Sequence, residues 1–261
     1  MEELVVVKIG GNVIDHPEAL DAFLTDFAQI KTPKILVHGG GKIATDIASK
    51  LGIEAVMVEG RRVTDKPMLD IVTMVYGGLI NKGIVAKLQA LGNNALGISG
   101  ADGNSILCNK RPIKEIDYGF VGDVKKVNNA LLDHLMEGGL VPVVCPLSHD
   151  GQGNMLNINA DTVATTLAKA MAETYQVSLL YCFELKGVLS DFEDKNSVIP
   201  QITLDEYTVL KTKGSISKGM IPKMDNSFDA IQNGVKQVVI CHSEDMLDVA
   251  QGIKKGTVLK K

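Results

Sequence analysis

The chain begins its first predicted strand with the apolar run Leu4-Val5-Val6-Val7-Lys8-Ile9, which Gly10 and Gly11 end. A continuous run of β-branched and other apolar residues predicts a strand buried on both faces, as in a parallel sheet covered by helices. The glycines let backbone N–H groups approach an anion closely, and Lys8 adds a positive charge beside them. This stretch therefore predicts both a buried strand and an anion site at its end.

Short apolar runs alternate with longer helical patterns along the rest of the chain. Further strands are predicted at residues 35–37, 95–98, 140–145, 177–182 and 235–241, and helices at residues 17–30, 67–91, 161–172 and 225–233, with one more between residues 41 and 51. Residues 105–108 and 119–127 have the partly polar character of a hairpin. This alternation is the signature of βαβ units. We therefore expect an α/β fold with one continuous, mainly parallel sheet.

Composition limits the classes of function. The 261 residues are 45% apolar and 22% charged, which is enough to bury a substantial core, so a disordered chain is excluded. The formal charge of -4 includes no basic stripe, and aromatic residues make up only 4%, which disfavours nucleic-acid binding. No apolar run approaches the roughly 20 residues of a membrane span, and Met1-Glu2-Glu3 forms no basic leader. We expect a cytoplasmic protein with no nucleic-acid or membrane partner.

Cysteine and histidine residues give no sign of a metal site. The four cysteines, Cys108, Cys145, Cys182 and Cys241, are far apart and form no C-x-x-C pair, and the five histidines are dispersed. Three of the cysteines end apolar runs. We expect buried, reduced cysteines and no protein-bound metal.

A second glycine cluster, His38-Gly39-Gly40-Gly41, follows the strand predicted at residues 35–37. It stands at the start of a helix, where unpaired N–H groups and the helix dipole favour an anion. Two such cradles indicate that two anionic groups are brought together. The chain has neither G-x-x-x-x-G-K-[ST] nor G-x-G-x-x-G, which disfavours a P-loop nucleotidase and a Rossmann dehydrogenase. The H-G-G-G stretch also resembles the oxyanion loop of esterases, but no G-x-S-x-G accompanies it.

Three further segments place charged or amide side chains near predicted helix starts. Gly60-Arg61-Arg62-Val63-Thr64-Asp65 precedes the long helix and supplies guanidinium groups suited to carboxylates. Asn157-Ile158-Asn159-Ala160-Asp161 opens another helix, where Asn159 has the character of an N-cap. Gly219-Met220-Ile221-Pro222-Lys223 places a lysine where a cation gains nothing from the dipole. Lys223 is therefore either a functional lysine or an ordinary surface lysine.

These motifs, in order from Lys8 to Lys223, resemble those of the amino acid kinase superfamily, and the resemblance covers most of the chain. It implies an open three-layer αβα sandwich with a mainly parallel central sheet. Residues 1–175 are expected to form an N-terminal lobe that binds an acylglutamate and dimerises, and residues 176–261 a C-terminal lobe that binds ATP. The implied reaction is ATP-dependent phosphorylation of the γ-carboxylate of N-acetyl-L-glutamate, a step of arginine biosynthesis. N-succinyl-L-glutamate as substrate, or another reaction of the superfamily, is the alternative.

The resemblance also implies roles for single residues. Lys8 and Lys223 are expected to flank the transferring phosphoryl group, with Asp161 positioning both lysines. The expected substrate-binding residues are Gly40, Gly41, Arg62, which holds the α-carboxylate, Asn157 and Asn159, and the expected phosphate-binding residues are Gly10 and Gly11. Cations and N–H groups are needed because a carboxylate attacking ATP brings two anions together. No general base is needed, since that carboxylate is already ionised at pH 7.

The resemblance implies partners as well. Mg²⁺ is expected to accompany ATP and to bind through phosphate oxygens and water rather than in a protein cage. Relatives that arginine inhibits carry an additional N-terminal helix that links dimers into hexamers, whereas this chain starts with its first strand. We therefore expect a homodimer without arginine feedback.

Two residues depart from the family pattern. Similar kinases show a T/S-D-V-x-G run where this chain has Phe183-Glu184-Leu185-Lys186-Gly187, so Glu184 is the candidate that replaces an aspartate at the nucleotide site. Arg61 stands where a neutral residue is typical. A second guanidinium there offers a partner for an acyl-end carboxylate, as in N-succinylglutamate, and an arginine facing solvent is the alternative.

Three competing functions follow from the same residues. A sister kinase acting on carbamate, aspartate, glutamate or UMP is the nearest, and both G-R-R-V-T-D and N-I-N-A-D argue against it. A serine acyl-hydrolase would release product without ATP. A non-catalytic sensor would bind its ligand without turnover, so an assay of ADP release separates all three.

Overall fold

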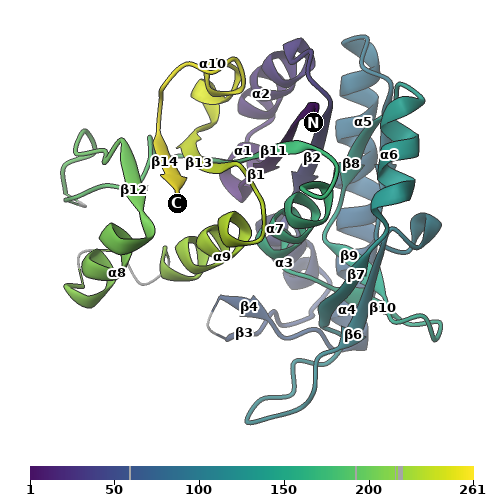
Figure 1. Cartoon of the computed structure of the whole chain (residues 1–261). Coiled ribbons are helices and arrows are strands. Elements are labelled where there is room, and N and C mark those ends of the chain that lie inside the picture. Colours follow the sequence, from purple (N-terminus) through teal and green to yellow (C-terminus); the bar gives the residue numbers. More distant parts are fainter. Residues whose placement is uncertain (59, 192, 215, 217–219) are drawn as a thin grey trace. The chain divides into compact units, whose positions relative to one another are not determined.

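The computed structural model describes residues 1–261 except 59, 192, 215 and 217–219 (Figure 1). The chain divides into two compact units. Unit 1 comprises residues 1–35 and 164–261, and unit 2 comprises residues 36–163. The first strand therefore belongs to the same unit as the C-terminal part of the chain. The assignment of ligands to lobes divided near residue 175 stays a prediction.

Unit 1 holds both ends of the chain. It contains, in chain order, β1 (Glu3–Ile9), α1 (Gly11–Asp15), α2 (Pro17–Gln29), most of α7 (Ala160–Met171), β11 (Gln176–Phe183), β12 (Gln201–Thr203), α8 (Leu204–Thr212), α9 (Ile221–Gln232), β13 (Gln237–His242), η3 (Ser243–Asp245), α10 (Met246–Ala250) and β14 (Thr257–Lys260).

The strands of unit 1 follow the order β12-β14-β13-β11-β1. β1, β11 and β13 are parallel neighbours, β12 is parallel to β14, and β13 pairs with β14 antiparallel. Leu4, Val6, Val7 and Ile9 of β1 are completely buried. Burial of each such side chain contributes about 1.5–3 kcal/mol. The continuous apolar runs thus form buried parallel strands, which confirms the predicted α/β class.

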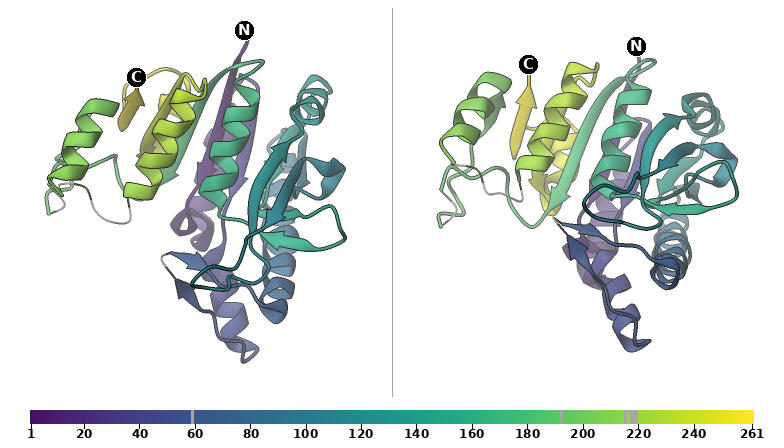
Figure 2. Two further views of the ribbon diagram at one scale, coloured as in Figure 1. Left: turned by 60° about the horizontal axis from the view of Figure 1, so that its bottom comes forward. Right: turned by 90° about the horizontal axis from the view of Figure 1, so that it is seen from below.

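Helices cover both faces of the unit 1 sheet. α2 packs with α10 on one face. α7 and α9 lie on the other face and stand in front of the strands in the left view of Figure 2. α2 has Pro17 in its first turn and buries one apolar stripe, made of Leu20, Phe23, Leu24 and Phe27. This is the helix that apolar spacing predicts for residues 17–30.

Unit 2 holds the middle of the chain. It contains β2 (Lys34–His38), which begins at the unit boundary, α3 (Gly41–Lys50), β3 (Met57–Val58), β4 (Arg61–Arg62), α4 (Lys66–Val72), η1 (Thr73–Ile80), α5 (Asn81–Ala90), β5 (Ala95–Ile98), η2 (Asp102–Asn104), β6 (Ile106–Lys110), β7 (Gly122–Val127), α6 (Asn129–Glu137), β8 (Val141–Val144), β9 (Leu147–His149) and β10 (Met155–Asn157).

Three sets of strands occur in unit 2. β2, β8 and β5 are parallel neighbours in that order. β10, β9, β6 and β7 form a second sheet, in which β6 and β7 pair antiparallel. This pairing confirms the predicted hairpin material. β3 and β4 form a short antiparallel ribbon.

Residues 66–90 form one long helical stretch from α4, η1 and α5, and its middle segment is π-helical. The face predicted to be apolar, Met68, Ile71, Val72 and Val75, is at most 2% exposed. By length and composition this stretch could cross a membrane, but half of its most apolar 18-residue segment is buried inside the protein. Such burial is the pattern of a core helix. Met74 and Leu79, by contrast, are 58% and 60% exposed.

Candidate active site

Lys8 and Lys223 approach the same tyrosine of unit 1. Lys8 lies in β1 directly opposite Tyr181 of β11 and is only 7% exposed. Lys223 is the third residue of α9, and its Nζ lies 6.0 Å from the ring centroid of Tyr181 and 5.1 Å from that of Phe183. An ammonium group at such distances is attracted to the ring face. Two lysines more than 200 residues apart in sequence therefore both lie next to Tyr181, near the carboxyl end of β11.

Tyr181 is held in place from the helical layer. Its hydroxyl shares a hydrogen bond of 2.6 Å with Oγ1 of Thr165 in α7. Residues at paired positions of parallel strands point to the same face of a sheet. Lys8 therefore points to the face that carries α7 and α9, which is where Lys223 lies.

Gly10 and Gly11 follow β1 at the same edge of the sheet. The N–H of Gly10 donates to the carbonyl oxygen of Cys182 at 2.9 Å. A Cβ on Gly10 would lie 3.3 Å from Cβ of Phe183, which is tighter than ordinary packing. The φ of Gly10 is -76°, so close packing rather than a left-handed backbone favours glycine there. Gly11 is the first residue of α1.

Gly40 and Gly41 form a second turn, in unit 2, at the start of α3. The φ of Gly40 is +142°, and a Cβ there would lie 2.2 Å from Cδ1 of Ile80, so no other residue fits without a shift. Gly41 is the first residue of α3, where backbone N–H groups lack partners within the helix. The predicted glycine turn is therefore present at the end of β2, and its role as an anion site stays a prediction.

Arg62 is brought to this glycine turn. It lies in β4 and is 8% exposed. Its Nη2 donates to the carbonyl oxygen of Gly41 and to Oγ1 of Thr45, both at 2.8 Å. Neighbouring residues of a strand point to opposite faces, and Arg61 is exposed. Arg61 therefore faces away from the guanidinium of Arg62.

Asn157 is linked to the same loop. Its Nδ2 donates to Oγ1 of Thr64 at 3.0 Å, and both side chains are buried. Asn159 is exposed, and its Oδ1 accepts from the N–H groups of Asp161 and Thr162 at 2.8 and 3.2 Å. Asn159 thus caps α7, as its sequence position indicates. The predicted contact of Asp161 with the two lysines joins the two units and stays a prediction.

Sequence reasoning missed the segment that ties these residues together. Residues 118–121, the strap segment, hydrogen-bond with Thr64 on one side and Asn157 on the other. The N–H of Thr64 donates to the carbonyl oxygen of Tyr118 at 2.9 Å, and the N–H of Phe120 donates to the carbonyl oxygen of Thr64 at 2.7 Å. The N–H of Asn157 donates to the carbonyl oxygen of Phe120 at 2.8 Å. A Cβ on Gly119, whose φ is +70°, would lie 2.2 Å from the carbonyl oxygen of Thr64. The one sequence signal was a glycine inside the predicted hairpin.

His38 is a buried structural residue behind the glycine turn. Nδ2 of Asn81 lies 3.0 Å from its Nε2 and can only donate, so Nδ1 carries the proton and donates to the carbonyl of Gly39 at 2.8 Å. Burial lowers the pKa of His38 to about 4. Asn81 also donates to the carbonyl of Val143 at 2.9 Å, so this contact fixes the end of β2 to β8.

Glu184 follows β11 and is exposed. It lines a cavity of about 260 Å³ in unit 1, together with Asn12, His16, Asp26, His242 and Glu244. Asn12, Glu184 and His242 all stand at the carboxyl ends of parallel strands or just beyond them. The predicted nucleotide-site candidate is thus next to the first glycine turn.

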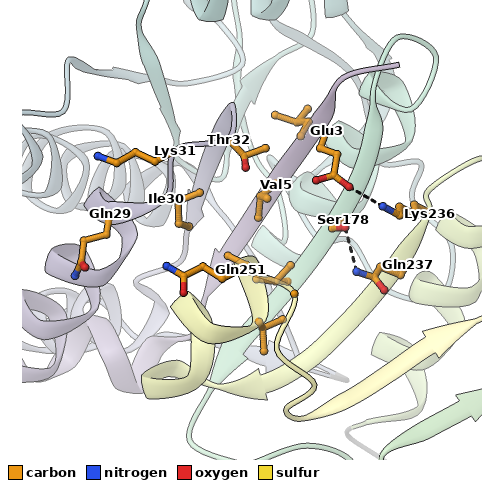
Figure 3. Close-up of a pocket in the computed structure, with 15 residues that line it drawn as sticks. Glu3, Val5, Gln29, Ile30, Lys31, Thr32, Ser178, Lys236, Gln237 and Gln251 are labelled. Atoms are coloured by element: carbon orange, nitrogen blue, oxygen red, sulfur yellow. Dashed lines mark hydrogen bonds and ion pairs between the residues drawn. The ribbon is translucent and has the colours of Figure 1, made fainter.

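A further cavity, of about 400 Å³, lies at the opposite, amino ends of β1, β11 and β13 (Figure 3). Its mouth carries an ion pair between Lys236 and Glu3 at 2.7 Å and a hydrogen bond from Gln237 to Ser178 at 3.2 Å. Since the glycine turn of unit 1 is at the carboxyl ends of these strands, this cavity takes no part in the candidate site.

The four cysteines are buried and reduced, as predicted. Burial raises the pKa of the Cys145 thiol to about 12. Among the residues that the structure describes, no group of three His, Cys, Asp or Glu side chains is placed to hold a metal ion. Gly219, the first residue of the G-M-I-P-K motif, lies outside the described residues.

The sequence model of the amino acid kinase family matches residues 3–242. Acetylglutamate kinase of Cytophaga hutchinsonii is 62% identical over 250 residues, which cover 95% of each chain. Acetylglutamate kinase of Bacteroides thetaiotaomicron is 55% identical over 260 residues, covering 100% of this chain and 99% of the relative.

Solved structures share the fold. The smu.665 protein of Streptococcus mutans superposes with a TM-score of 0.81 at 26% identity and covers 98% of both chains. N-acetylglutamate synthase of Neisseria gonorrhoeae, solved with coenzyme A and N-acetyl-glutamate, gives a TM-score of 0.83 at 19% identity, with 100% of this chain and 59% of that chain covered. The latter likeness concerns the fold alone.

Proposed function

The chain belongs to the amino acid kinase family, and from this premise we propose that it catalyses ATP-dependent phosphorylation of the γ-carboxylate of N-acetyl-L-glutamate, a step of arginine biosynthesis. The product is an acyl phosphate, and the second product is ADP. Relatives named acetylglutamate kinase at 62% and 55% identity over nearly the whole chain support this substrate.

The convergence of Lys8 and Lys223 on Tyr181 is the single observation that carries the proposal. A carboxylate that attacks the γ-phosphorus of ATP meets strong repulsion, and negative charge builds up on the equatorial oxygens in the transition state. Two ammonium groups and the N–H of Gly11 offset that charge, while Gly10, whose own N–H is bonded to Cys182, allows the close turn. Both lysines act from fixed positions, so little reorganisation is needed as the reaction proceeds.

Unit 2 supplies the groups for the acylglutamate. Arg62 binds the α-carboxylate, because a guanidinium presents a planar fork of donors that matches a carboxylate. The N–H groups of Gly40 and Gly41 bind the γ-carboxylate at the start of α3. Asn157 and Asn159 complete the substrate contacts. Catalysis is then mostly positioning of two anions, with no general base.

Asp161, Mg²⁺ and Glu184 have the remaining roles in the proposed reaction. Asp161, in the first turn of α7, orients the two ammonium groups. Mg²⁺ bound with ATP would neutralise phosphate charge and would be held through ATP oxygens and water. Glu184 and the cavity beside it serve the nucleotide.

We also propose a cytoplasmic homodimer. The exposed side chains of Met74 and Leu79 on the long helical stretch support it. Burial of these two side chains against a second copy of the chain would remove their apolar surface from water.

ADP release, measured with a coupled assay, tests the proposal. The panel contains N-acetylglutamate, N-succinylglutamate, free glutamate, aspartate, carbamate and UMP. We expect turnover with N-acetylglutamate far above that with every non-acylated acceptor. Turnover with carbamate, aspartate or UMP instead would replace this function by a sister activity of the family.

A further inference from the structure

Tyr76 lies in the π-helical segment of the long helical stretch. η1 spans Thr73–Ile80, and Tyr76 and Ile80 are among its buried residues. A π-helical turn contains more residues than an α-helical turn, and such turns occur frequently at functional sites. The apolar pattern of residues 67–91 predicts an uninterrupted α-helix, so this segment requires its own explanation.

The segment packs on the glycine turn of unit 2. A Cβ on Gly40 would lie 2.2 Å from Cδ1 of Ile80 and 3.3 Å from Cδ1 of Tyr76. Cδ1 of Ile80 therefore occupies the space that the missing side chain of Gly40 leaves open, and the ring of Tyr76 borders it. The hydroxyl of Tyr76 lies further along, 3.9 Å from the ideal Cβ position of Gly41.

The same ideal Cβ position of Gly41 lies 3.6 Å from Nη2 of Arg62. The hydroxyl of Tyr76 and the guanidinium of Arg62 are thus neighbours above one glycine. Burial raises the pKa of Tyr76, while the charge of the neighbouring Arg62 guanidinium opposes that rise. The residue Tyr76 is only 5% exposed, and its hydroxyl stays neutral at physiological pH.

Arg62 is held by several acceptors. Its Nη2 donates to the carbonyl of Gly41 and to Oγ1 of Thr45, and its Nη1 lies 3.8 Å from Sδ of Met68. An arginine side chain has many rotamers and loses conformational entropy when it is held in one of them. Acceptors that fix the guanidinium before substrate arrives reduce the entropy lost on binding.

We propose that Tyr76 is a positioning residue, which the π-helical segment brings to the glycine turn so that its hydroxyl orients Arg62 for the substrate α-carboxylate. This inference rests on the proposed function and deepens it. Tyr76 acts through Arg62 and does not itself contact the reacting atoms. Thr45 supports the guanidinium from the first turns of α3 in the same way.

Tyr76→Phe tests the inference, because it removes the hydroxyl and keeps the ring that fills the space beside Gly40. Hydrogen bonds to charged groups contribute about 1.5–3 kcal/mol, so we expect KM for N-acetylglutamate to rise about tenfold or more. KM for ATP and kcat should change less than twofold. Tyr175→Phe, just before β11, is the matched control and should leave all three constants unchanged. An unchanged KM for N-acetylglutamate in Tyr76→Phe would overturn the inference.

A double-mutant cycle shows whether Tyr76 acts through Arg62. Tyr76→Phe is combined with Arg62→Lys, which removes the planar fork and keeps the charge. We expect the effect of Tyr76→Phe on kcat/KM for N-acetylglutamate to disappear in the Arg62→Lys background. A full, independent loss in that background would mean that Tyr76 binds substrate directly, and positioning would be wrong.

Two measurements keep the outcomes separate. Thermal unfolding of each variant identifies any loss that is due to folding. The wild-type protein is assayed first with ATP and N-acetylglutamate. Absence of turnover there contradicts the proposed function itself, whereas wild-type turnover with an unaffected Tyr76→Phe variant contradicts only the role of Tyr76.

Discussion

Lys8 and Lys223 are the residues on which the proposed chemistry depends most. Either residue changed to Ala should lower kcat about 100- to 1,000-fold, the range seen when one preorganised donor to transition-state charge is removed. KM for both substrates should change much less, because each ammonium group acts mainly in the transition state. Steady-state kinetics measures both constants.

Lys254→Ala provides the control for the lysine variants, since Lys254 is exposed in the loop before β14. It should leave kcat unchanged. Near-normal kcat in both Lys8→Ala and Lys223→Ala would show that neither lysine takes part in phosphoryl transfer.

Arg61 decides between the two acyl groups. Its side chain is exposed and faces away from Arg62, which favours the acetyl substrate. We therefore expect kcat/KM to be higher for N-acetylglutamate than for N-succinylglutamate, and Arg61→Leu to leave that ratio unchanged. A preference for the succinyl substrate that is lost in Arg61→Leu would instead assign Arg61 to the acyl end.

His38 makes the stability of the protein depend on pH. Its pKa is about 4 in the folded chain and 6.5 as the ordinary value. Above pH 6.5 the imidazole is neutral in both states and the full stability is present. As pH falls from 6.5 to 4, the unfolded chain binds a proton that the folded chain does not. The unfolding free energy therefore declines, by ~3 kcal/mol from this group.

Denaturant unfolding at several pH values measures this contribution. His38→Gln, which keeps an acceptor for Asn81, should show a flatter decline between pH 6.5 and 4 than the wild type. His134→Asn, at an exposed position of α6, should decline as the wild type does. Equal slopes for wild type and His38→Gln would contradict the buried neutral histidine.

At the scale of elements, continuous apolar runs were the most informative signal. β1, β2, β11 and β13 lie where the runs of residues 4–9, 35–37, 177–182 and 235–241 predict them, because a strand buried on both faces has no polar face. α6, α8, β12 and β14 were not predicted. α6 and α8 each bury a single residue, and β12 and β14 are only 3 and 4 residues long. None of these elements therefore contains a long apolar run.

The strap segment could not be predicted for a different reason. Its hydrogen bonds go to Thr64 and Asn157, which are about 55 and 35 residues away in sequence, and no local periodicity records such partners. The expected hairpin began at Gly119, whereas β7 begins at Gly122. Residues 118–121 make these tertiary contacts instead of ladder pairs.

Gly119→Ala should test the strap segment. The positive φ costs an alanine about 1–2 kcal/mol, and the new Cβ would also collide with the carbonyl of Thr64. We expect the free energy of unfolding to fall clearly more than this strain alone, and KM for N-acetylglutamate to rise, because Thr64 and Asn157 shift together. Denaturant unfolding and kinetics measure the two effects.

Gly92→Ala is the matched control for this substitution. Gly92 has φ +75°, close to that of Gly119, but a Cβ there meets nothing within 4 Å. It should show the backbone strain alone and normal kinetics. If the two variants behave alike, the close approach to Thr64 has no energetic consequence.

At the scale of the whole molecule, the residues predicted for the site are divided between the two units. Lys8, Gly10, Gly11, Glu184 and Lys223 belong to unit 1, whereas Gly40, Gly41, Arg61, Arg62, Asn157, Asn159 and Asp161 belong to unit 2. A boundary near residue 175 follows sequence order. β1, however, pairs with β11 over its whole length, so the first strand groups with the end of the chain. Such long-range pairing leaves no local mark in the sequence.

The proposed homodimer is tested by light scattering. We expect a mass of two chains for the wild type. Met74→Glu combined with Leu79→Glu should shift the mass toward one chain, because charges in an apolar interface are costly. Leu51→Glu, at a position 61% exposed next to α3, should leave the dimer intact. A wild-type mass of one or six chains would contradict the proposal.

Trapping of the acyl phosphate tests the central claim most directly. The protein is incubated with ATP, Mg²⁺, N-acetylglutamate and hydroxylamine, and hydroxamate and ADP are both quantified. Transfer to the γ-carboxylate predicts one hydroxamate for each ADP, and both products formed about 100- to 1,000-fold more slowly in the Lys8→Ala variant. ADP released without hydroxamate would show that the phosphoryl group goes elsewhere.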